Sequence, residues 1–239
     1  MHSRLRIYSL AVILGVLTLA ALPATAGIII VGNPPDSGTG NCFPFGCAYS
    51  GEYQQVYQNT QFTTGPILIT DLEFYNTQFN SGATAMNTGN FDISLSTTSA
   101  SWNTLSGTFA NNIGSNNTTV FNGSLAQSWA FGDTLTIDLT TPFLYNPANG
   151  NLLMDVVATG TNDAGGAIYF DTNGYNNGNF NGNDFLGRVY GSGTVNAGYG
   201  LVTGFSTGTL QNTPEPGFTV LLGLALSGMG LAFRRRKIS

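Results

Sequence analysis

The residue types that carry most enzyme chemistry are scarce in this chain. Its single histidine is His2, and between residues 27 and 213 there is no lysine and one arginine, Arg188. Catalysis by a Ser-His-Asp triad, or by its lysine variants, therefore has no base in this segment. Eleven acids and one arginine give the segment a net charge near −10. Because clustered Lys and Arg are needed to bind a phosphate backbone, this charge excludes nucleic acid as a partner.

Carboxylates are the acid–base groups that remain. Glycoside hydrolysis uses two carboxyl groups at a set separation, and the acids of the segment offer many pairs, but none lies in a recognisable motif. Glu52 and Glu73 are its only glutamates, and Glu73 falls on the outer side of an expected strand. We interpret the acids as solubilising side chains and expect no enzymatic activity. A hydrolase with two carboxylates is the less favoured alternative.

The segment 171–184 (DTNGYNNGNFNGND) is unusually rich in oxygen-bearing side chains. Asn and Asp side chains and backbone carbonyls are the ligands that Ca²⁺ prefers. The spacing of an EF-hand loop fails here at its fifth, sixth and twelfth places. Asp163, Asp171 and Asp184 are the candidate ligands of a calcium site formed in three dimensions. A polar surface loop without a metal ion is the alternative.

Two cysteines stand close together in the sequence Asn-Cys-Phe-Pro-Phe-Gly-Cys, at Cys42 and Cys47. An exported protein meets an oxidising compartment, so we expect a disulfide that closes this small loop. A metal site is disfavoured because no further cysteine or histidine lies nearby, and a redox pair usually has two intervening residues.

Exposed aromatic rings could stack on sugars, and the sequence offers several candidates. Some of them must fill the core instead. The candidates are Tyr49, Tyr53, Tyr57, Trp102, Trp129, Tyr145, Tyr175 and Tyr199.

Apolar and polar residues alternate with a period of two along the segment that would have to position these side chains. Four sets of apolar residues are expected to share a face: Phe91, Ile93 and Leu95; Leu135, Ile137 and Leu139; Leu68, Leu72 and Phe74; and Leu152, Met154 and Val156. Such alternation is typical of half-buried strands, and clusters of Gly, Asn and Pro separate them. The pattern predicts an all-β fold, a jelly-roll-like β-sandwich. A parallel β-helix is the competitor, but no fixed repeat supports it.

The first 26 residues have the three parts of a secretory signal peptide. Two arginines precede an apolar run from residue 7 to residue 22, and the small residues Ala24 and Ala26 then stand before Gly27. This arrangement predicts export through the secretion machinery and cleavage before Gly27. An uncleaved membrane anchor is the alternative.

The far end of the chain carries a second apolar run, at 217–233, which contains no charged residue. As a helix it would rise about 25 Å, within the range of short membrane spans. The bases Arg234, Arg235, Arg236 and Lys237 follow at once, and such a cluster holds its end in the cytoplasm. The pattern predicts a single transmembrane helix with the preceding body outside the inner membrane. A buried core helix beside a basic patch is the alternative.

Pro214, Glu215 and Pro216 stand just before this apolar run. The Pro-Glu-Pro sequence, the short apolar span and the Arg-rich end together resemble the PEP-CTERM sorting signal. The resemblance implies that an exosortase-type membrane protease recognises the tail and cleaves near Pro214–Pro216. The body would be anchored transiently in the membrane and then pass to the cell surface or extracellular matrix. The two prolines also hold an extended segment that lacks two backbone donors, which a protease can grip.

The body between the two ends resembles a recurrent ectodomain of PEP-CTERM proteins. The stretches that carry this likeness are 52–79, 91–98, 109–125, 142–156, 187–190 and 200–205. The resemblance implies fold and location, and it names no activity. We expect four parts: signal peptide 1–26, β-sandwich ectodomain 27–205, polar linker 206–213 and sorting signal 214–237.

The favoured hypothesis is an exported, non-enzymatic surface or matrix protein with a structural or adhesive role. An acidic, lysine-free surface suits a hydrated matrix. A carbohydrate-binding module, with Ca²⁺ as a possible cofactor and an extracellular polysaccharide as its partner, is the second hypothesis.

Overall fold

The computed structural model describes residues 27–209, except 33–34, 36–39, 63–64, 164, 177–178 and 181. This part is a body of β-strands, as the alternation predicts. Its helical elements are three short 3₁₀ turns: η1 (Asn59–Gln61), η2 (Phe109–Asn111) and η3 (Pro147–Asn149). The turn-forming Gly and Asn clusters break the chain before any helical period develops, so strands follow one another throughout.

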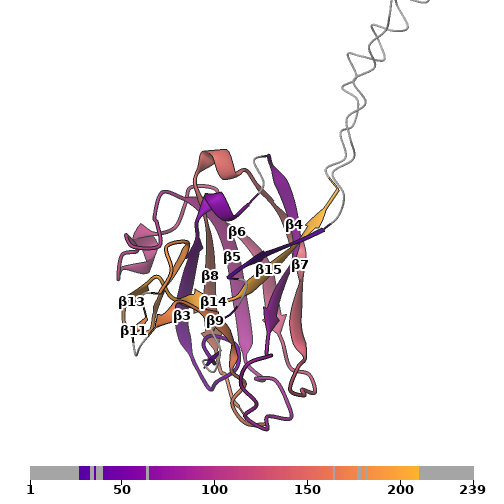
Figure 1. Cartoon of the computed structure of the whole chain (residues 1–239). Coiled ribbons are helices and arrows are strands. Elements are labelled where there is room, and N and C mark those ends of the chain that lie inside the picture. Colours follow the sequence, from indigo (N-terminus) through magenta and orange to yellow (C-terminus); the bar gives the residue numbers. More distant parts are fainter. Residues whose placement is uncertain are drawn as a thin grey trace, which may run out of the picture. The chain divides into compact units, whose positions relative to one another are not determined.

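Two antiparallel sheets face each other across the core (Figure 1). The four-stranded sheet has the order β1 (Gly27–Val31), β15 (Thr203–Gly208), β4 (Ile67–Tyr75), β7 (Thr134–Tyr145). The six-stranded sheet has the order β13 (Thr194–Ala197), β12 (Leu186–Tyr190), β3 (Gly51–Tyr57), β8 (Asn151–Thr159), β5 (Asn90–Thr98), β6 (Thr118–Ser124). The predicted β-sandwich is therefore confirmed.

Shorter strands complete the body. A three-stranded sheet has the order β14 (Gly200–Leu201), β9 (Phe170–Asn173), β2 (Gly40–Asn41). A two-stranded pair joins β10 (Tyr175–Asn176) to β11 (Asn179–Phe180).

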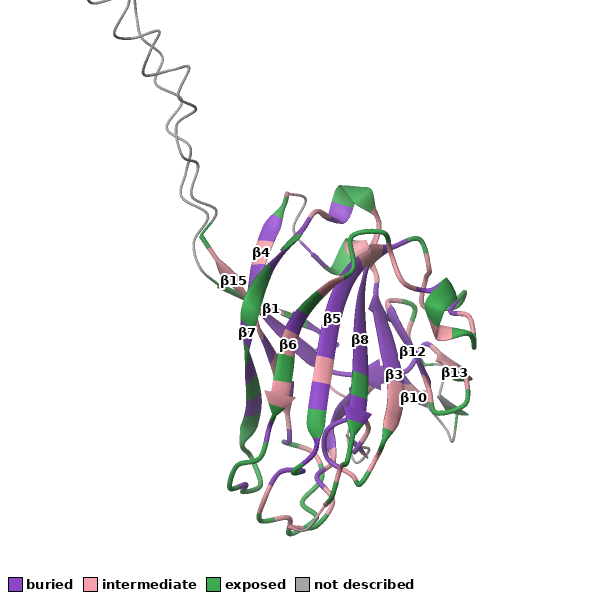
Figure 2. Cartoon of the chain, turned by 180° about the vertical axis from the view of Figure 1, so that it is seen from behind, coloured by how far each residue is buried: buried purple, intermediate pink, exposed green. Residues whose placement is uncertain are grey.

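Three of the four predicted apolar sets lie in the core as expected. On β7 the buried positions Leu135, Ile137 and Leu139 alternate with exposed ones, and the apolar sets of β5 and β8 are also buried (Figure 2). The six-stranded sheet differs in its outer face, where polar residues such as Ser96 are buried too. The segment 99–117 between β5 and β6 explains this, because its Leu105 packs on Val56 and Leu153 of the outer face.

The prediction for β4 was wrong at one end. Leu72 and Phe74 face the core as expected, but Leu68 is only half-buried, and Ile67 and Ile69 are buried in its place. The pairing of β4 with β7 shifts between Ile69 and Asp71. This bulge inserts one residue and reverses the side on which the preceding side chains lie.

The two ends of the body meet in one strand pair. β1 runs antiparallel to β15, with Gly27 opposite Thr207 and Val31 opposite Thr203. β1 was not predicted, because a continuous run of isoleucines shows no alternation. The last strand was predicted to end at Phe205, whereas β15 continues to Gly208, so the predicted linker 206–213 begins three residues too early. Residues 206–208 pair with β4 and belong to the sandwich.

Candidate functional site

The loop closed by Cys42 and Cys47 sends its two phenylalanines in opposite directions. The structure joins the cysteines in a disulfide, with their Cα atoms 5.2 Å apart. Phe45 is buried in the core, with its ring centre 4.7 Å from that of Phe74 and 5.6 Å from that of Phe91. Phe43 remains half-buried at the surface. The short loop therefore fixes an aromatic ring on the surface by anchoring its neighbour inside.

Phe43 belongs to a cluster of three half-buried rings with Tyr49 and Tyr190, which we call the aromatic ledge. The ring centre of Phe43 lies 4.8 Å from that of Tyr49 and 5.6 Å from that of Tyr190. The Tyr49 hydroxyl donates to the carbonyl of Glu52 at 2.5 Å and accepts from the Gly191 N–H at 2.9 Å. Burial raises the pKa of Tyr49, so this hydroxyl stays protonated and keeps its ring in place.

Arg188 lies behind the ledge and is only 4% exposed. Its guanidinium stands between two rings, 4.6 Å from the centre of Tyr190 and 4.5 Å from that of Tyr199. Its Nε donates to Asn196 Oδ1 at 3.0 Å, whereas Nη1 is buried without a hydrogen-bond partner. Cation–π contact with two rings replaces the carboxylate that a buried cation normally needs. The arginine thus holds the Tyr190 ring of the ledge.

A second polar group lies on the outer face of the six-stranded sheet, where β8 carries Asp155. This residue is 8% exposed and stands opposite Gln54 of β3 in the register. Burial, followed by the charge of neighbouring Glu52, raises the pKa of Asp155 from 3.8 to about 7. Burial also raises the pKa of Glu52. Asp155 Oδ1 is buried without a hydrogen-bond partner, so this carboxyl binds its proton more tightly than an exposed aspartate does.

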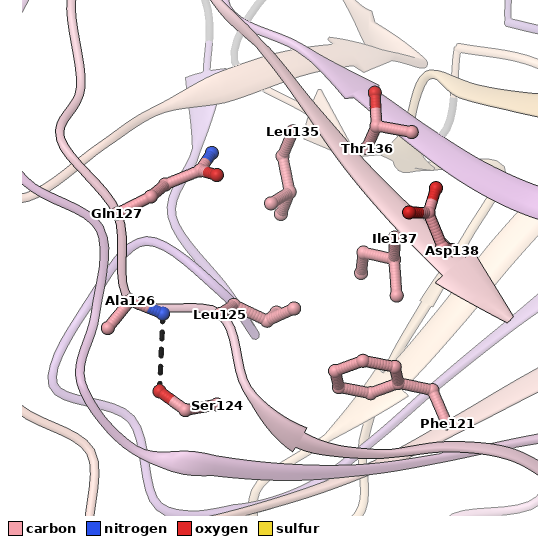
Figure 3. A pocket seen from close by; sticks show the side chains of 9 residues that line it. All are labelled: Phe121, Ser124, Leu125, Ala126, Gln127, Leu135, Thr136, Ile137 and Asp138. Atoms are coloured by element: carbon pink, nitrogen blue, oxygen red, sulfur yellow. Dashed lines mark hydrogen bonds between the residues drawn. The ribbon is translucent and has the colours of Figure 1, made fainter. Parts of the chain in front are cut away.

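A pocket of about 210 Å³ lies between β6 and β7, where the two sheets meet at one side of the sandwich. Figure 3 shows Leu125, Leu135 and Phe121 directed into it, with Gln127 at its margin. Asp138 is the titratable residue of its lining. A hydrogen bond with Asp71, directly opposite on β4, raises the pKa of Asp138. The lining combines apolar side chains with the hydroxyls of Ser124 and Thr136, the Gln127 amide and one carboxyl group.

The structure does not bring the predicted calcium ligands together. Asp171, 2% exposed, accepts the Thr77 N–H at 2.8 Å, the Thr77 hydroxyl at 2.6 Å and the Gln78 N–H at 3.0 Å. Asp184 is exposed and Asp163 is half-buried. Among the described residues, no three His, Cys, Asp or Glu side chains are placed to hold a metal ion. The calcium prediction for these three residues was therefore wrong, because the Asp171 carboxylate instead accepts hydrogen bonds from Thr77 and Gln78, just after β4.

The aromatic candidates divide as expected between core and surface. Trp129 and four tyrosines are buried: Tyr53, Tyr57, Tyr145 and Tyr199. Tyr49, Trp102 and Tyr175 are half-buried. Of these three, Tyr49 belongs to the ledge, whose other members were missed because they converge only in the folded body.

The residues of the two predicted address signals lie outside the described part, except Gly27, which opens β1. This applies to Ala24 and Ala26, to Pro214–Pro216, to the apolar run 217–233 and to the basic end at 234–237. In the part of the chain that the structure describes, no helix is long and apolar enough to cross a membrane.

A comparison with known families matches residues 212–237 to the PEP-CTERM protein-sorting motif. The chain carries a PEP-CTERM sorting signal. This signal implies an exported protein that an exosortase, a membrane protease, processes. The match covers the Pro-Glu-Pro sequence, the apolar run and the basic end at the positions expected from the sequence. Searches of curated proteins and of solved structures return no match to the chain.

Proposed function

We propose that this chain is a non-enzymatic module of the cell surface or of an extracellular polysaccharide matrix, with a structural or adhesive role. One observation carries the proposal: the PEP-CTERM signal starts at residue 212, four residues beyond the end of β15 at Gly208. β15 pairs with β1 and β4, so among the described residues every strand pairing lies before the signal. Cleavage near Pro214–Pro216 would release the sandwich intact.

The chemistry of the body supports a role without catalysis. Segment 27–213 lacks histidine and lysine, and its one arginine, Arg188, is buried between tyrosine rings. Asp155 carries a raised pKa, but it is only 8% exposed and its Oδ1 is buried. A net charge near −10 keeps such a body soluble in a hydrated matrix.

The route to the surface follows from the two ends. The secretion machinery would carry the body across the inner membrane, and the run 217–233 would then anchor it while Arg234–Lys237 stay in the cytoplasm. The exosortase would end this anchored stage.

Replacing all four bases at 234–237 by glutamine tests this route in cells. The protein is expected to remain unprocessed in the membrane fraction, because the cytoplasmic end is no longer held by charge. Ile238→Ala, in the adjoining position, is the matched control and should be processed normally. Release of the four-base variant at the wild-type level and mass would contradict the route.

Carbohydrate binding is the second candidate function, and the aromatic ledge favours it. Phe43, Tyr49 and Tyr190 form one contiguous surface of half-buried rings, braced by the disulfide loop and by Arg188. Aromatic faces of this kind pack on the apolar faces of sugar rings. The tilts of 41° and 37° between neighbouring rings suit a bent glycan chain better than a flat one.

A glycan array measures this candidate directly. If the ledge binds a glycan, Tyr190→Ala should weaken binding about tenfold, whereas Tyr190→Phe, which keeps the ring, should bind like the wild type. Trp102→Ala, at a half-buried ring that is not part of the ledge, is a second control. Binding that survives Tyr190→Ala and Phe43→Ala would place the glycan elsewhere.

A further inference from the structure

The two main sheets leave four strands at their edges: β1 and β7 on one, β13 and β6 on the other. An edge strand presents unpaired backbone N–H and C=O groups, to which another strand can add. Natural proteins protect such edges with charge, bulges, short length or a covering element. The four edges of this body differ in how far they are protected.

Three of the edges carry recognisable protection. β6 and β7 lie side by side, and the Thr140 hydroxyl donates to the carbonyl of Val120 at 3.0 Å across the gap. β7 also carries Asp138, and its pairing with β4 contains a bulge. The pairing of β6 with β5 contains a bulge as well. β13 has only four residues.

β1 has five residues, one more than β13, and it lacks the charge and the bulge of the other edges. Its sequence, GIIIV, contains no charge and no proline, and its register with β15 runs without a shift. Ile28 and Ile30 lie on the outer face of the sheet and are 46% and 38% exposed. Within the described residues, β15 is the only strand that pairs with β1. The outer edge of β1 is therefore a flat, apolar and uncharged strand edge.

We infer that β1 pairs with β1 of a second copy of this chain, antiparallel and two-fold symmetric about Ile29. Antiparallel partners point to the same face, so only registers that match outer residues with outer residues are allowed. Among these, the register centred on Ile29 pairs all five residues. It places Ile28 opposite Ile30 of the second copy, and Ile29 opposite Ile29. Two four-stranded sheets then become one continuous sheet of eight strands.

A second copy fits this edge better than a different partner. The body carries a net charge near −10, so a basic partner would bind to its acidic surfaces. β1 itself has no charged residue with which such a partner could pair. A copy of the same strand needs no charge, because the two-fold pairing sets isoleucine against isoleucine, and such apolar cross-strand pairs stabilise a sheet.

This pairing keeps the terminal ends of the two bodies apart. Gly27 and Gly208 lie at the same end of the β1–β15 pair. In the two-fold arrangement the two copies of that end are separated along the strands by four residues, about 14 Å. Mutual repulsion of the acidic bodies opposes association, so added salt should strengthen the dimer.

The oligomeric state of the full chain in detergent, measured by sedimentation over a range of concentrations, tests the inference. The wild type should form dimers, and Ile30→Lys should be monomeric, because lysine replaces the apolar pair with Ile28 of the second copy on the outer face, and charged side chains on an edge strand oppose pairing. Leu144→Lys is the matched control: Leu144 is 57% exposed on the same sheet but lies on β7, and this variant should still dimerise. A wild type that stays monomeric, or dimers that persist in Ile30→Lys, would overturn the inference.

Cysteine cross-linking tests the register independently of stability. Ile28→Cys and Ile30→Cys are prepared as separate full-chain variants. A mixture of the two should form an intermolecular disulfide, because position 28 lies opposite position 30. Each variant alone should cross-link far less, since like positions lie two residues apart along the strands. Equal cross-linking in all three samples, or none in the mixture, would exclude the register.

Discussion

The outer faces of the two sheets share one sequence pattern but lie in different environments. On β7 of the four-stranded sheet, Thr136 and Asp138 alternate with core residues and are exposed. On β3 and β8 of the six-stranded sheet, Gln54 and Asp155 hold equivalent outward positions and are buried near the segment 99–117. Alternation decides on which side of a sheet a residue lies, whereas the covering segment decides whether that residue keeps its water.

The covered face therefore depends on internal hydrogen bonds, since a buried polar group without a partner is destabilising. Asn112 provides several of these bonds. Its Nδ2 donates to Gln54 Oε1 and to the carbonyl of Ser106, both at 2.9 Å, and its Oδ1 accepts the Ser106 N–H at 2.8 Å. The open face needs no such network, because water satisfies its polar groups.

The largest effect is expected for Asn112→Ala on the covered face. The change leaves Gln54 and Ser106 with buried, unpaired groups, and should lower the free energy of unfolding by about 3 kcal/mol. Thr136→Ala on the open face is the control and should change it by less than about 0.5 kcal/mol. Denaturant unfolding measures both variants. Equal losses in the two would remove the distinction between the faces.

Asp155→Asn should change how stability depends on pH. In the folded body Asp155 keeps its proton up to about pH 7, whereas its ordinary pKa is 3.8. Folding thus takes up a proton between these values, so the free energy of unfolding falls as the pH rises through this window, by at most about 1.4 kcal/mol per pH unit.

The asparagine variant should lose this slope and become more stable than the wild type near pH 8. Asp184→Asn, at an exposed position, is the matched control and should leave the slope unchanged. Unfolding curves at pH 4, 6 and 8 measure the effect. A wild type whose stability rises from pH 5 to pH 8 relative to Asp155→Asn would contradict the buried proton.

The smallest effect is expected for Asp138→Asn on the open face. Asp138 stands directly opposite Asp71, and two like charges at such a pair are destabilising. Removing one charge should stabilise the body at pH 7 by about 0.5 kcal/mol. High salt should reduce this gain, because the pair is exposed and screened. Thermal unfolding at low and high salt measures it, and a gain that is independent of salt would point to another cause.

Much of the fold follows from local alternation, and the errors in the prediction have local causes. The core positions of β5, β7 and β8 are readable because side chains alternate across a strand. The β4 bulge after Ile69 places Leu68 on the opposite side of the sheet from the one that alternation predicts. Nothing in the sequence indicates this bulge. β1 was missed because its continuous run of isoleucines shows no alternation, although it pairs with β15.

The candidate site was less predictable, because its members come from distant parts of the chain. Tyr49 could be proposed as an exposed ring. The contacts of Phe43 with Tyr49 and Tyr190 form only in the folded body, in which β3 and β12 pair. The calcium prediction failed for the same reason. The partner of Asp171 is the backbone at Thr77, 94 residues away, which composition cannot reveal. The sorting signal is a contiguous motif at residues 212–237, and was therefore found from the sequence.

The intact mass of the mature protein recovered from the cell surface or medium tests the central claim most directly. The account predicts a chain that begins at Gly27, ends near Pro214–Pro216 and is two hydrogen atoms lighter than the reduced form, because Cys42 and Cys47 are joined. Surface protein that still carries residues 217–237, or whole protein retained inside the cell, would contradict an exported module released by an exosortase.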